Sequence, residues 1–403
     1  MGGLKRIIFT VTNDLSYDQR MQKICRSLSH AGYAVELVGR QRDFSIPLAA
    51  ESFEQTRLKC IFNKGKLFYI EYNIRLLIFL TFSQFDAACA VDLDTIAPVY
   101  IIGKLKGAKL VYDAHEYFTE VPEVVRRPQV QKVWQWIEKI FVPLFDAAYT
   151  VSEGLAELFQ QKYNKHFEVI MNVPVLEQSQ SLQEDVLTAQ PLSPFRPLKG
   201  KPEPVLVSPL GDGRGRLFLP LRGAGGLLYQ GALNEGRGLE HLITAMQQID
   251  CPLKLAGEGD LSAQLRRQVK DLQLDNKITF LGYVPPAQLK KITAEATIGI
   301  NLVENTGLSY YYSLSNKFFD YIHASVPQVC IGFPEYEKLN KRYNVALLVK
   351  DCSTLQITEA LNRLLKDHNL YRELQKNCEV CTRDLNWQRE EIKLLAIYDR
   401  LLR

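Results

Sequence analysis

Short apolar runs alternate with stretches of helical spacing along most of this chain, and the runs end in polar or glycine-containing loops. Residues 6–12 form the first run and open into the polar loop 13–20, after which apolar residues recur at helical spacing from Met21 to Leu28. Continuous apolar runs of this length are typical of parallel strands that are buried on both faces. Strands that alternate with helices in this way predict an α/β fold with doubly wound sheets, whose ligands bind beyond the carboxyl ends of the strands.

The alternation occurs twice and is interrupted once. Residues 177–226 are first polar and then rich in proline, glycine and arginine, which favours an interdomain linker with a mobile insertion. A chain of 403 residues is also longer than one compact core of typical size. We therefore predict a Rossmann-like domain at 1–176, a linker or insertion at 177–226, a second Rossmann-like domain at 227–384, and a last helix at 385–403 that packs back on the first domain.

The composition argues against several classes of protein. A hydrophobic content of 46%, with 23% charged residues and a net charge of +4, is ordinary for a soluble globular protein and gives no indication of nucleic-acid binding. The eight cysteines have no framework spacing, and the lone pair Cys378 and Cys381 lacks the further ligands that a zinc site needs. Reduced thiols, and an N-terminus that runs straight into a strand without a secretory signal, predict a cytoplasmic protein with no metal site.

Residues 57–85 are basic at first and then strongly apolar. Their uninterrupted apolar part is too short to span a bilayer, because Glu71, Asn73 and Arg75 interrupt it. One interpretation is a buried helix of the first domain. The other is a surface that dips into a membrane to reach a lipid-linked acceptor, since basic residues beside apolar ones suit an interfacial segment. The second interpretation predicts peripheral contact with the cytoplasmic face of an inner membrane.

Polar side chains follow three strands of the first half: Asn13, Asp18, Arg20, Asp92, Asp94, His115 and Glu116. Because the carboxyl ends of parallel strands meet at one edge of a sheet, we expect the acidic strand ends and the His115-Glu116 pair to share that edge. A histidine at such a place can exchange a proton with a substrate hydroxyl near neutral pH. A histidine satisfied by local backbone groups is the ordinary alternative.

The second half contains a comparable site. Residues 298–303 form an apolar run, and Ser315 and Asn316 later lead into a helix that carries Lys317 and Asp320 in its first turns. The amides of a helix N-terminus attract an anion, Lys317 adds a full charge, and Asp320 could accept hydrogen bonds from sugar hydroxyls. An ordinary capped helix is the alternative, because serine and asparagine are favoured caps.

Arg237 stands at the entrance of another helix of the second half. Its guanidinium could meet a phosphate there in a bidentate manner. Residues 252–259 form a strand with a tight glycine turn, and residues 278–285 form a strand and turn. These loops are expected at the same edge as Lys317.

The chain resembles the retaining, family-four-type glycosyltransferases of the GT-B fold. The blocks that carry the resemblance cover nearly everything except 177–226 and occur in a specific order and spacing: VTNDLSYDQR, VDLDT, VYDAHEYFTEVPE, NVP, LLYQGALNEGRGLE, LAGEGDL, ITFLGYVP and SLSNKFFDYIHASVPQV. The resemblance implies two Rossmann-like domains facing across a cleft, with an acceptor-side first domain and a nucleotide-sugar donor held mainly by the second. Such enzymes are similar in needing no metal or other cofactor and in retaining the anomeric configuration.

The resemblance also implies roles for single residues. On the catalytic side, His115 matches the first-domain histidine near the transferred sugar, and Glu116 is its neighbour. Asn13, Asp18, Arg20, Asp92 and Asp94 would lie on the acceptor side. The donor site would be built from Gly231, Arg237, Gly257, Tyr283, Val284, Glu304, Ser315, Asn316, Lys317 and Asp320.

Within that donor site, the resemblance implies that Arg237 and residues 315–317 contact the diphosphate. Gly257 and residues 283–284 would lie near the nucleobase, and Asp320 would hold the ribose. The chain departs from the family pattern at three places. Asp320 stands where a glutamate is usual, Ala232 stands where a basic residue often follows the glycine, and residues 13–15 replace a glycine-rich loop.

From these features we predict transfer of a hexosyl unit from a nucleotide sugar to a glycan or lipid-linked acceptor. Two alternatives stay open at this point. A GT-B-fold epimerase would act on the nucleotide sugar itself, with acid/base groups drawn from Asp18, Asp92, Asp94 and Glu116. A non-catalytic partner in a glycan-assembly complex would bind a nucleotide sugar without turnover. The donor sugar and base, the acceptor, the linkage and the oligomeric state do not follow from these residues.

Overall fold

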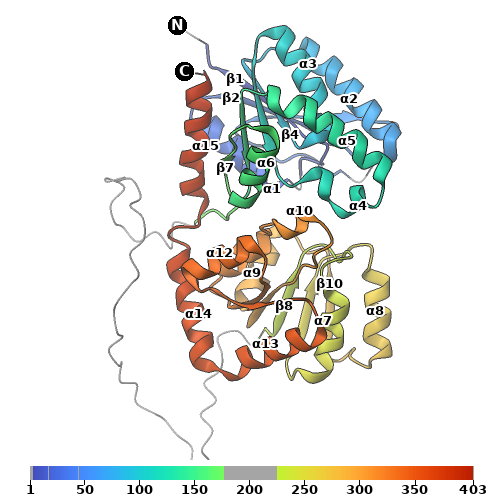
Figure 1. Cartoon of the computed structure of the whole chain (residues 1–403), viewed down its shortest axis with the longest axis vertical. Coiled ribbons are helices and arrows are strands. Elements are labelled where there is room, and N and C mark those ends of the chain that lie inside the picture. Colours follow the sequence, from blue (N-terminus) through green and yellow to red (C-terminus); the bar gives the residue numbers. More distant parts are fainter. Residues whose placement is uncertain (1–2, 17, 44, 177–224, 403) are drawn as a thin grey trace, which may run out of the picture.

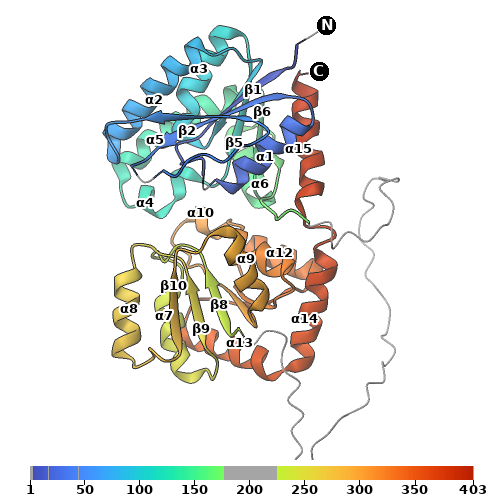
Figure 2. The same cartoon turned by 180° about the vertical axis from the view of Figure 1, so that it is seen from behind.

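The computed structural model describes residues 3–16, 18–43, 45–176 and 225–402. Two α/β domains are stacked along the long axis of the molecule, as Figure 1 and Figure 2 show from opposite sides. Nearly all of the predicted linker or insertion at 177–226 lies outside the described residues; Gly225 and Gly226 lead directly into the second sheet.

Within the described residues, seven parallel strands form the sheet of the first domain. In chain order they are β1 (Arg6–Thr10), β2 (Ala34–Gln41), β3 (Glu54–Lys59), β4 (Ala87–Val91), β5 (Lys109–Ala114), β6 (Ala147–Thr150) and β7 (Glu168–Val169). Their spatial order is β3-β2-β1-β4-β5-β6-β7. The direction of winding reverses between β1 and β4, so this sheet has its topological switch point there.

Helices cover both faces of this sheet. One face carries α1 (Gln19–His30), and the other carries α2 (Gly65–Phe82), α3 (Ile96–Lys106), α5 (Pro128–Phe141) and α6 (Glu153–Tyr163). The short helix α4 (Pro122–Val125) packs against α5 at the end of the domain that faces the second domain. Successive strand residues point to opposite faces. Ile8 and Leu110 accordingly pack with α2 and α3, whereas Ile7 and Val111 pack with α1.

The second domain repeats the architecture. Its described strands are β8 (Leu227–Gln230), β9 (Leu253–Ala256), β10 (Ile278–Gly282), β11 (Ile298–Asn301), β12 (Gln328–Ile331) and β13 (Ala346–Val349), in the order β10-β9-β8-β11-β12-β13. Its helices are α7 (Leu239–Ala245), α8 (Ser262–Asp271), α9 (Pro286–Glu295), α10 (Leu308–Tyr311), α11 (Asn316–His323), α12 (Pro334–Tyr343), α13 (Thr354–Lys366) and α14 (His368–Cys381). The switch point lies between β8 and β11. The predicted doubly wound α/β architecture is thus confirmed in both halves.

The last helix, α15 (Trp387–Leu402), belongs spatially to the first domain. After α14 the chain crosses back, and α15 lies beside the first domain in Figure 1. Trp387, Leu394, Ile397 and Tyr398 are buried in the core that α1 shares with β1. The Trp387 Nε1–H donates a hydrogen bond of 2.9 Å to Ser27 Oγ on α1. The C-terminal end of the chain therefore covers one face of the N-terminal sheet.

Loops at the carboxyl ends of the two sheets meet between the domains. The Asn172 amide donates a hydrogen bond of 2.8 Å to Asn316 Oδ1, and the Gly154 N–H donates one of 2.9 Å to Glu335 Oε1. Arg126 and Glu235 form an ion pair of 2.7 Å across the same gap. The strand ends that carry the candidate residues therefore face each other.

Residues 57–85 form the end of β3 and the helix α2. The interpretation as a helix of the first domain is confirmed for one side of α2, where Phe68, Tyr72, Leu76 and Leu80 are buried. The opposite side is a stripe of exposed apolar side chains. Among the residues that the structure describes, no helix combines the length and apolar character needed to cross a bilayer.

Candidate active site

A cavity of about 400 Å³ opens at the switch point of the first sheet. Asn13, Asp92, Asp94 and Glu116 line it, so four of the predicted residues share one space. A second group of lining residues is cationic and consists of Arg40, Arg42 and Lys64. An edge where two strands diverge is where α/β sheets bind their ligands, and this cavity occupies that edge.

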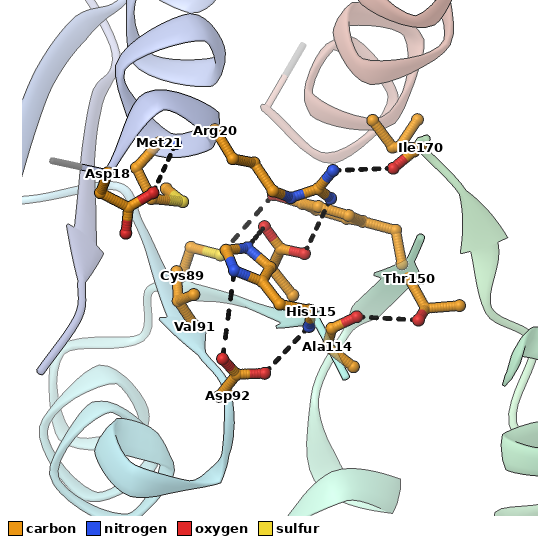
Figure 3. Close-up of polar contacts among 12 residues, drawn as sticks. Asp18, Arg20, Met21, Cys89, Val91, Asp92, Ala114, His115, Thr150 and Ile170 are labelled. Atoms are coloured by element: carbon orange, nitrogen blue, oxygen red, sulfur yellow. Dashed lines mark hydrogen bonds and ion pairs between the residues drawn. The ribbon is translucent and has the colours of Figure 1, made fainter. Parts of the chain in front are cut away.

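His115 stands at the end of β5 in a network of buried charges, which Figure 3 shows. Its Nε2 lies 2.9 Å from Asp113 Oδ2. The other oxygen of Asp113 accepts a hydrogen bond of 3.1 Å from Arg20, whose guanidinium also donates to the Ile170 carbonyl at 2.9 Å. On the far side of the ring, Nδ1 faces Asp92 Oδ2 at 4.0 Å. Both ring nitrogens of His115 thus face carboxylates.

This network favours a charged histidine. Burial alone would lower the pKa of His115, but the charge and hydrogen bond of Asp113 outweigh it and raise that pKa to about 8. Asp113 is fully buried, yet the positive charges of Arg20 and His115 lower its pKa below the usual carboxyl value. The raised pKa favours the imidazolium form of His115, in which the Nδ1–H faces Asp92.

The carboxyl groups of the cavity also have raised pKa values, which for an acid favours the neutral form. Burial raises the pKa of Asp92, and it raises the pKa of Asp94 to about 6 while Thr12 donates a hydrogen bond to that carboxyl. Glu116 lines the same cavity, and desolvation raises its pKa to about 7 against the opposing charges of His115 and Arg237. A carboxyl group that titrates near neutral pH can act as a general acid or base.

Arg237 and Lys317 bring two positive charges together at the switch point of the second sheet. Lys317, in the first turn of α11, is only 8% exposed, and its Nζ lies 4.4 Å from the centre of the Tyr229 ring. Arg237 stacks on the Tyr310 ring at 4.5 Å. Burial, and then the charge of Arg237, lower the pKa of Lys317 to about 7. No ion pair joins either cation to a carboxylate in the described part of the chain.

Asp320, one turn further along α11, is held by a chain of side chains. Gln230 Nε2 donates to Asp320 Oδ2 at 2.7 Å, and Thr293 Oγ1 donates to Gln230 Oε1 at 2.7 Å. Burial raises the pKa of Asp320 to about 6, although the nearby charges of Lys23 and Lys317 oppose this. One carboxylate oxygen is thus oriented by Gln230 at the end of β8, beside the loop that carries Gly231.

Ser315 occupies the N-cap position of α11, but its side chain forms no capping hydrogen bond. The hydroxyl instead donates to Asn301 Oδ1 at 2.8 Å and accepts from Tyr336 at 3.1 Å. The expectation of an ordinary serine-capped helix is therefore wrong. The Ser315 side chain thus leaves the first turn of α11 uncapped, and the neighbouring Asn316 side chain accepts from Asn172 of the first domain.

The two predicted glycines lie against each other. Gly257 has a φ of +151°, and a Cβ there would overlap the carbonyl oxygen of Gly231, which has a φ of +130°. Only glycine permits this approach of the loops after β8 and β9. Tyr283 is 63% exposed beyond β10, next to Val284, and Glu304 follows β11 with its N–H donating to the Gly236 carbonyl at 2.9 Å. All the predicted donor-site residues lie at this edge of the second sheet.

Two predicted acceptor-side residues lie elsewhere. Asp18 caps α1 by accepting from the Met21 N–H at 3.1 Å, and Arg20 is buried behind His115 with Asp113. Neither lines the cavity of the first domain. Conversely, the sequence interpretation did not assign roles to Asp113, Gln230 or Arg40. Asp113 was recognisable in principle, because positions two apart on a strand share a face and Asp113 precedes His115 by two.

Comparisons with known proteins agree with this geometry. Residues 225–379 match the family model of glycosyl transferases group 1. A sucrose-phosphate synthase from Thermosynechococcus elongatus is similar in structure, with a TM-score of 0.73, 16% identity, and coverage of 98% of this chain and 99% of that chain. HepE from Anabaena in complex with UDP and glucose has a TM-score of 0.69 and 12% identity, covering 98% and 99% of the two chains.

WaaG, described as a glycosyltransferase involved in lipopolysaccharide biosynthesis, has a TM-score of 0.65 and 14% identity, covering 97% of this chain and 99% of that chain. A comparison with curated proteins found no match. At these identities the solved structures establish the fold, and the family model identifies the second domain. Residues 225–379 match the group 1 glycosyltransferase family, and the chain as a whole has the GT-B fold of these structures.

Proposed function

We propose that this enzyme transfers a hexosyl unit from a nucleoside diphosphate sugar to a glycan or lipid-linked acceptor, with retention of the anomeric configuration and without a metal ion. The bond from the anomeric carbon to the diphosphate breaks, and a bond from that carbon to the acceptor oxygen forms. The acceptor hydroxyl gives its proton to the departing diphosphate, so charge and atoms balance. The second domain would hold the donor and the first the acceptor.

One observation supports this proposal most strongly: Arg237 lies near Lys317 in the first turn of α11, and neither cation forms an ion pair with a carboxylate among the described residues. Two like charges in a semi-enclosed site destabilise each other unless an anion joins them. A diphosphate carries the charge that this site needs, and the same cations can stabilise the leaving group that a metal would otherwise neutralise. Asp320, which Gln230 orients, would accept hydrogen bonds from the ribose hydroxyls in the same site.

The first domain would contribute His115 and Glu116 from the opposite side of the cleft. Arg237 lies close enough to Glu116 for its charge to lower the pKa of that carboxyl, so the two halves of the site face one another. His115, charged and donating, would hold a hydroxyl of the transferred sugar. The structures of HepE contain UDP and UDP-glucose. UDP-sugars are therefore the first donors to test.

A panel of nucleotide sugars, each incubated with and without glycan acceptors, tests the proposed function. We expect nucleoside diphosphate to be released only when an acceptor is present. The new glycosidic bond should have the donor's anomeric configuration by NMR, and the activity should persist in EDTA. Isomerised donor without transfer would instead establish an epimerase. Binding without turnover for every donor and acceptor pair would leave only a nucleotide-sugar-binding role.

The lowered pKa of Lys317 predicts a pH-dependent affinity for UDP. The free site has a Lys317 pKa of about 7, and a bound diphosphate would raise it, so binding takes up a proton above pH 7. The affinity should therefore be highest below that pKa and fall as the pH rises, approaching a limit of about tenfold per pH unit. Isothermal titration between pH 7.5 and 9 measures this, because the terminal phosphate of UDP is already ionised there.

Lys317→Arg is the matched control, since its charge does not titrate in this range. This variant should bind UDP with a nearly constant affinity from pH 7.5 to 9 if its melting temperature equals that of the wild type. An identical fall in both proteins would mean that another group takes up the proton, and the assignment of Lys317 to the diphosphate would be wrong.

We further propose that the exposed stripe of α2 contacts a membrane surface. Ile70, Ile74, Ile78 and Phe82 are 56%, 55%, 52% and 83% exposed, and they recur every four residues along one side of the helix. Leu105 on the neighbouring α3 is 79% exposed, and α3 ends in lysines. An apolar stripe beside basic residues suits a surface with anionic lipids.

Flotation with phosphatidylglycerol vesicles tests this contact. The double variant Ile74→Glu and Ile78→Glu should reduce the vesicle-bound fraction about tenfold, because two apolar side chains are lost from the contact and two negative charges are added. Leu355→Glu, at an equally exposed leucine on the second domain, should leave binding unchanged. Equal flotation of the wild type and the double variant would contradict the proposal.

A further inference from the structure

The cavity of the first domain has two chemically opposite walls, and the proposed transfer reaction uses only one of them. The wall beside His115 carries Asp92, Asp94 and Glu116. The other wall carries Arg40 at the end of β2, Arg42 just after it, and Lys64 at the start of α2. A binding site of this kind fits a ligand with hydroxyl groups at one end and a negative charge at the other.

Arg40 is the most informative residue of the cationic wall. It is 6% exposed, and its guanidinium lies over the Phe68 ring at 3.9 Å and donates to the carbonyl and side-chain oxygens of Asn63 at 2.7 and 3.0 Å. Its Nε is buried and has no hydrogen-bond partner in the described part of the chain. Within the described residues Arg40 forms no ion pair. The Asn63 side-chain amide lies between it and Asp43, and donates to the Asp43 carboxylate at 3.0 Å.

A buried guanidinium without a counter-ion is costly for a protein to maintain. Burial and then the charge of Arg42 lower the pKa of Arg40 from its ordinary value, and the opposing effects of its neighbours, Asp43 among them, are smaller. An anion bound in the cavity would supply the missing partner.

The start of α2 adds to the same wall. Lys64, its N-cap residue, forms no side-chain capping bond, and the first turn of this 18-residue helix contains no acidic side chain. Lys64 and Gly65 both line the cavity. Unpaired amides and the positive end of a helix dipole favour phosphate groups in particular.

Aromatic side chains connect the two walls. Phe68 and Tyr69 of α2 and Phe118 after β5 also line the cavity, and Tyr69 lies near both groups, because Arg40, Asp94 and Glu116 all affect its pKa. The rings of Tyr69 and Phe118 are both held by Trp134, at centroid distances of 5.5 and 5.0 Å. Such fixed rings provide apolar surface for the face of a sugar ring.

We infer that this cavity binds the acceptor and that the acceptor carries a phosphate or diphosphate group, held by Arg40, Arg42 and Lys64. Its free sugar hydroxyl is then directed to the wall of Asp92, Asp94 and Glu116, opposite the donor. This inference rests on the proposed transfer function and names the substrate class of its second site. A soluble sugar phosphate and a lipid-linked sugar share this chemistry.

Titration of the full chain with inorganic pyrophosphate, at a saturating concentration of UDP to fill the donor site, tests the inference. The wild type should bind pyrophosphate under these conditions. The double variant Lys64→Ala and Arg42→Gln should bind it at least about tenfold more weakly, because two charge-assisted contacts are lost. Lys66→Ala, two residues after Lys64 and outside the cavity lining, should bind like the wild type.

Absence of pyrophosphate binding at saturating UDP, or equal affinity of the double variant and the wild type, would overturn the inference. Failure of the proposed function looks different, because then no donor of the panel would be transferred to an acceptor, whether or not pyrophosphate binds. Arg40→Gln is a second variant, to be compared at an unchanged melting temperature, and it should weaken pyrophosphate in the same direction.

Competition against pyrophosphate identifies the source of the phosphate. Displacement by a hexose 1-phosphate but not by the neutral methyl glycoside supports the inference and points to a soluble acceptor. Tighter displacement by vesicles that carry a polyprenyl diphosphate sugar supports it and points to a lipid-linked one. Equal displacement by the neutral glycoside would contradict the need for an anionic group.

Discussion

Replacing Arg237 with alanine should lower the turnover number about 10²- to 10³-fold while the fold stays intact. Arg237 provides a preorganised positive charge where a diphosphate would develop negative charge as it departs, and removal of one such group costs this much in other enzymes. Arg237 precedes α7 and contacts the Tyr310 ring through its guanidinium. We expect the fold to tolerate the loss of this one contact. Steady-state kinetics with the donor identified in the nucleotide-sugar panel give the comparison.

Arg267→Ala is the matched control for Arg237. Arg267 lies on α8 of the same domain, and among the described residues its side chain donates only to the Ala263 carbonyl one turn earlier, at 3.4 Å. This variant should retain wild-type turnover and UDP affinity. Unchanged kinetics in the Arg237 variant, with equal melting temperatures, would remove that residue from the donor site.

Replacing Asp113 with asparagine should destabilise the protein by about 3–5 kcal/mol, because it leaves Arg20 buried without its charge partner. Asp113 is fully buried, and Arg20 is 4% exposed. The charges of Arg20 and His115 lower the pKa of Asp113, so the carboxylate contributes its stability above the ordinary aspartate pKa and loses it as the pH falls through the lowered value. The stability difference between variant and wild type should therefore shrink in acid.

Urea denaturation at neutral and acidic pH measures that difference. The double variant Arg20→Met and Asp113→Leu should lose less stability than the sum of the two single changes, because no unpaired charge remains. NMR titration of the His115 ring provides a second readout, since the pKa of His115 should fall from about 8 when Asp113 no longer supports the proton. A His115 pKa that stays at the wild-type value would show that Asp113 does not position the proton.

Much of the fold was predictable because its signals are local. Apolar runs such as residues 87–91 and 298–303 are too short for helices and become β4 and β11, and the alternation with helices determines a parallel sheet. Other features depend on contacts between distant segments. The edge strand β3 (Glu54–Lys59) has a polar sequence and exists because it pairs with β2. The exposed stripe of α2 is likewise not separable from its buried stripe by composition, since both sides are apolar.

The candidate site likewise has residues that the sequence predicted and residue partnerships that it did not. Strand-end position and the family resemblance led to His115, Arg237 and Lys317, which the fold brings to the facing edges of the two sheets. Partnerships across the fold could not be predicted, because they join residues far apart in the chain. Arg20 looked like a loop residue for a ligand, but its guanidinium contacts Asp113, 93 positions away. Gln230 similarly orients Asp320 from 90 positions away.

A crystal structure of the full chain with UDP tests the central claim most directly. The diphosphate should lie within hydrogen-bonding distance of Arg237, Lys317 and the first amides of α11, with the ribose hydroxyls at Asp320 and the base near Gly257 and Tyr283. Variants with Arg237→Ala or Lys317→Met should then lose most of their UDP affinity in solution. UDP bound instead in the cavity of the first domain, with Arg237 and Lys317 left without an anion, would contradict the assignment of donor and acceptor to the two domains.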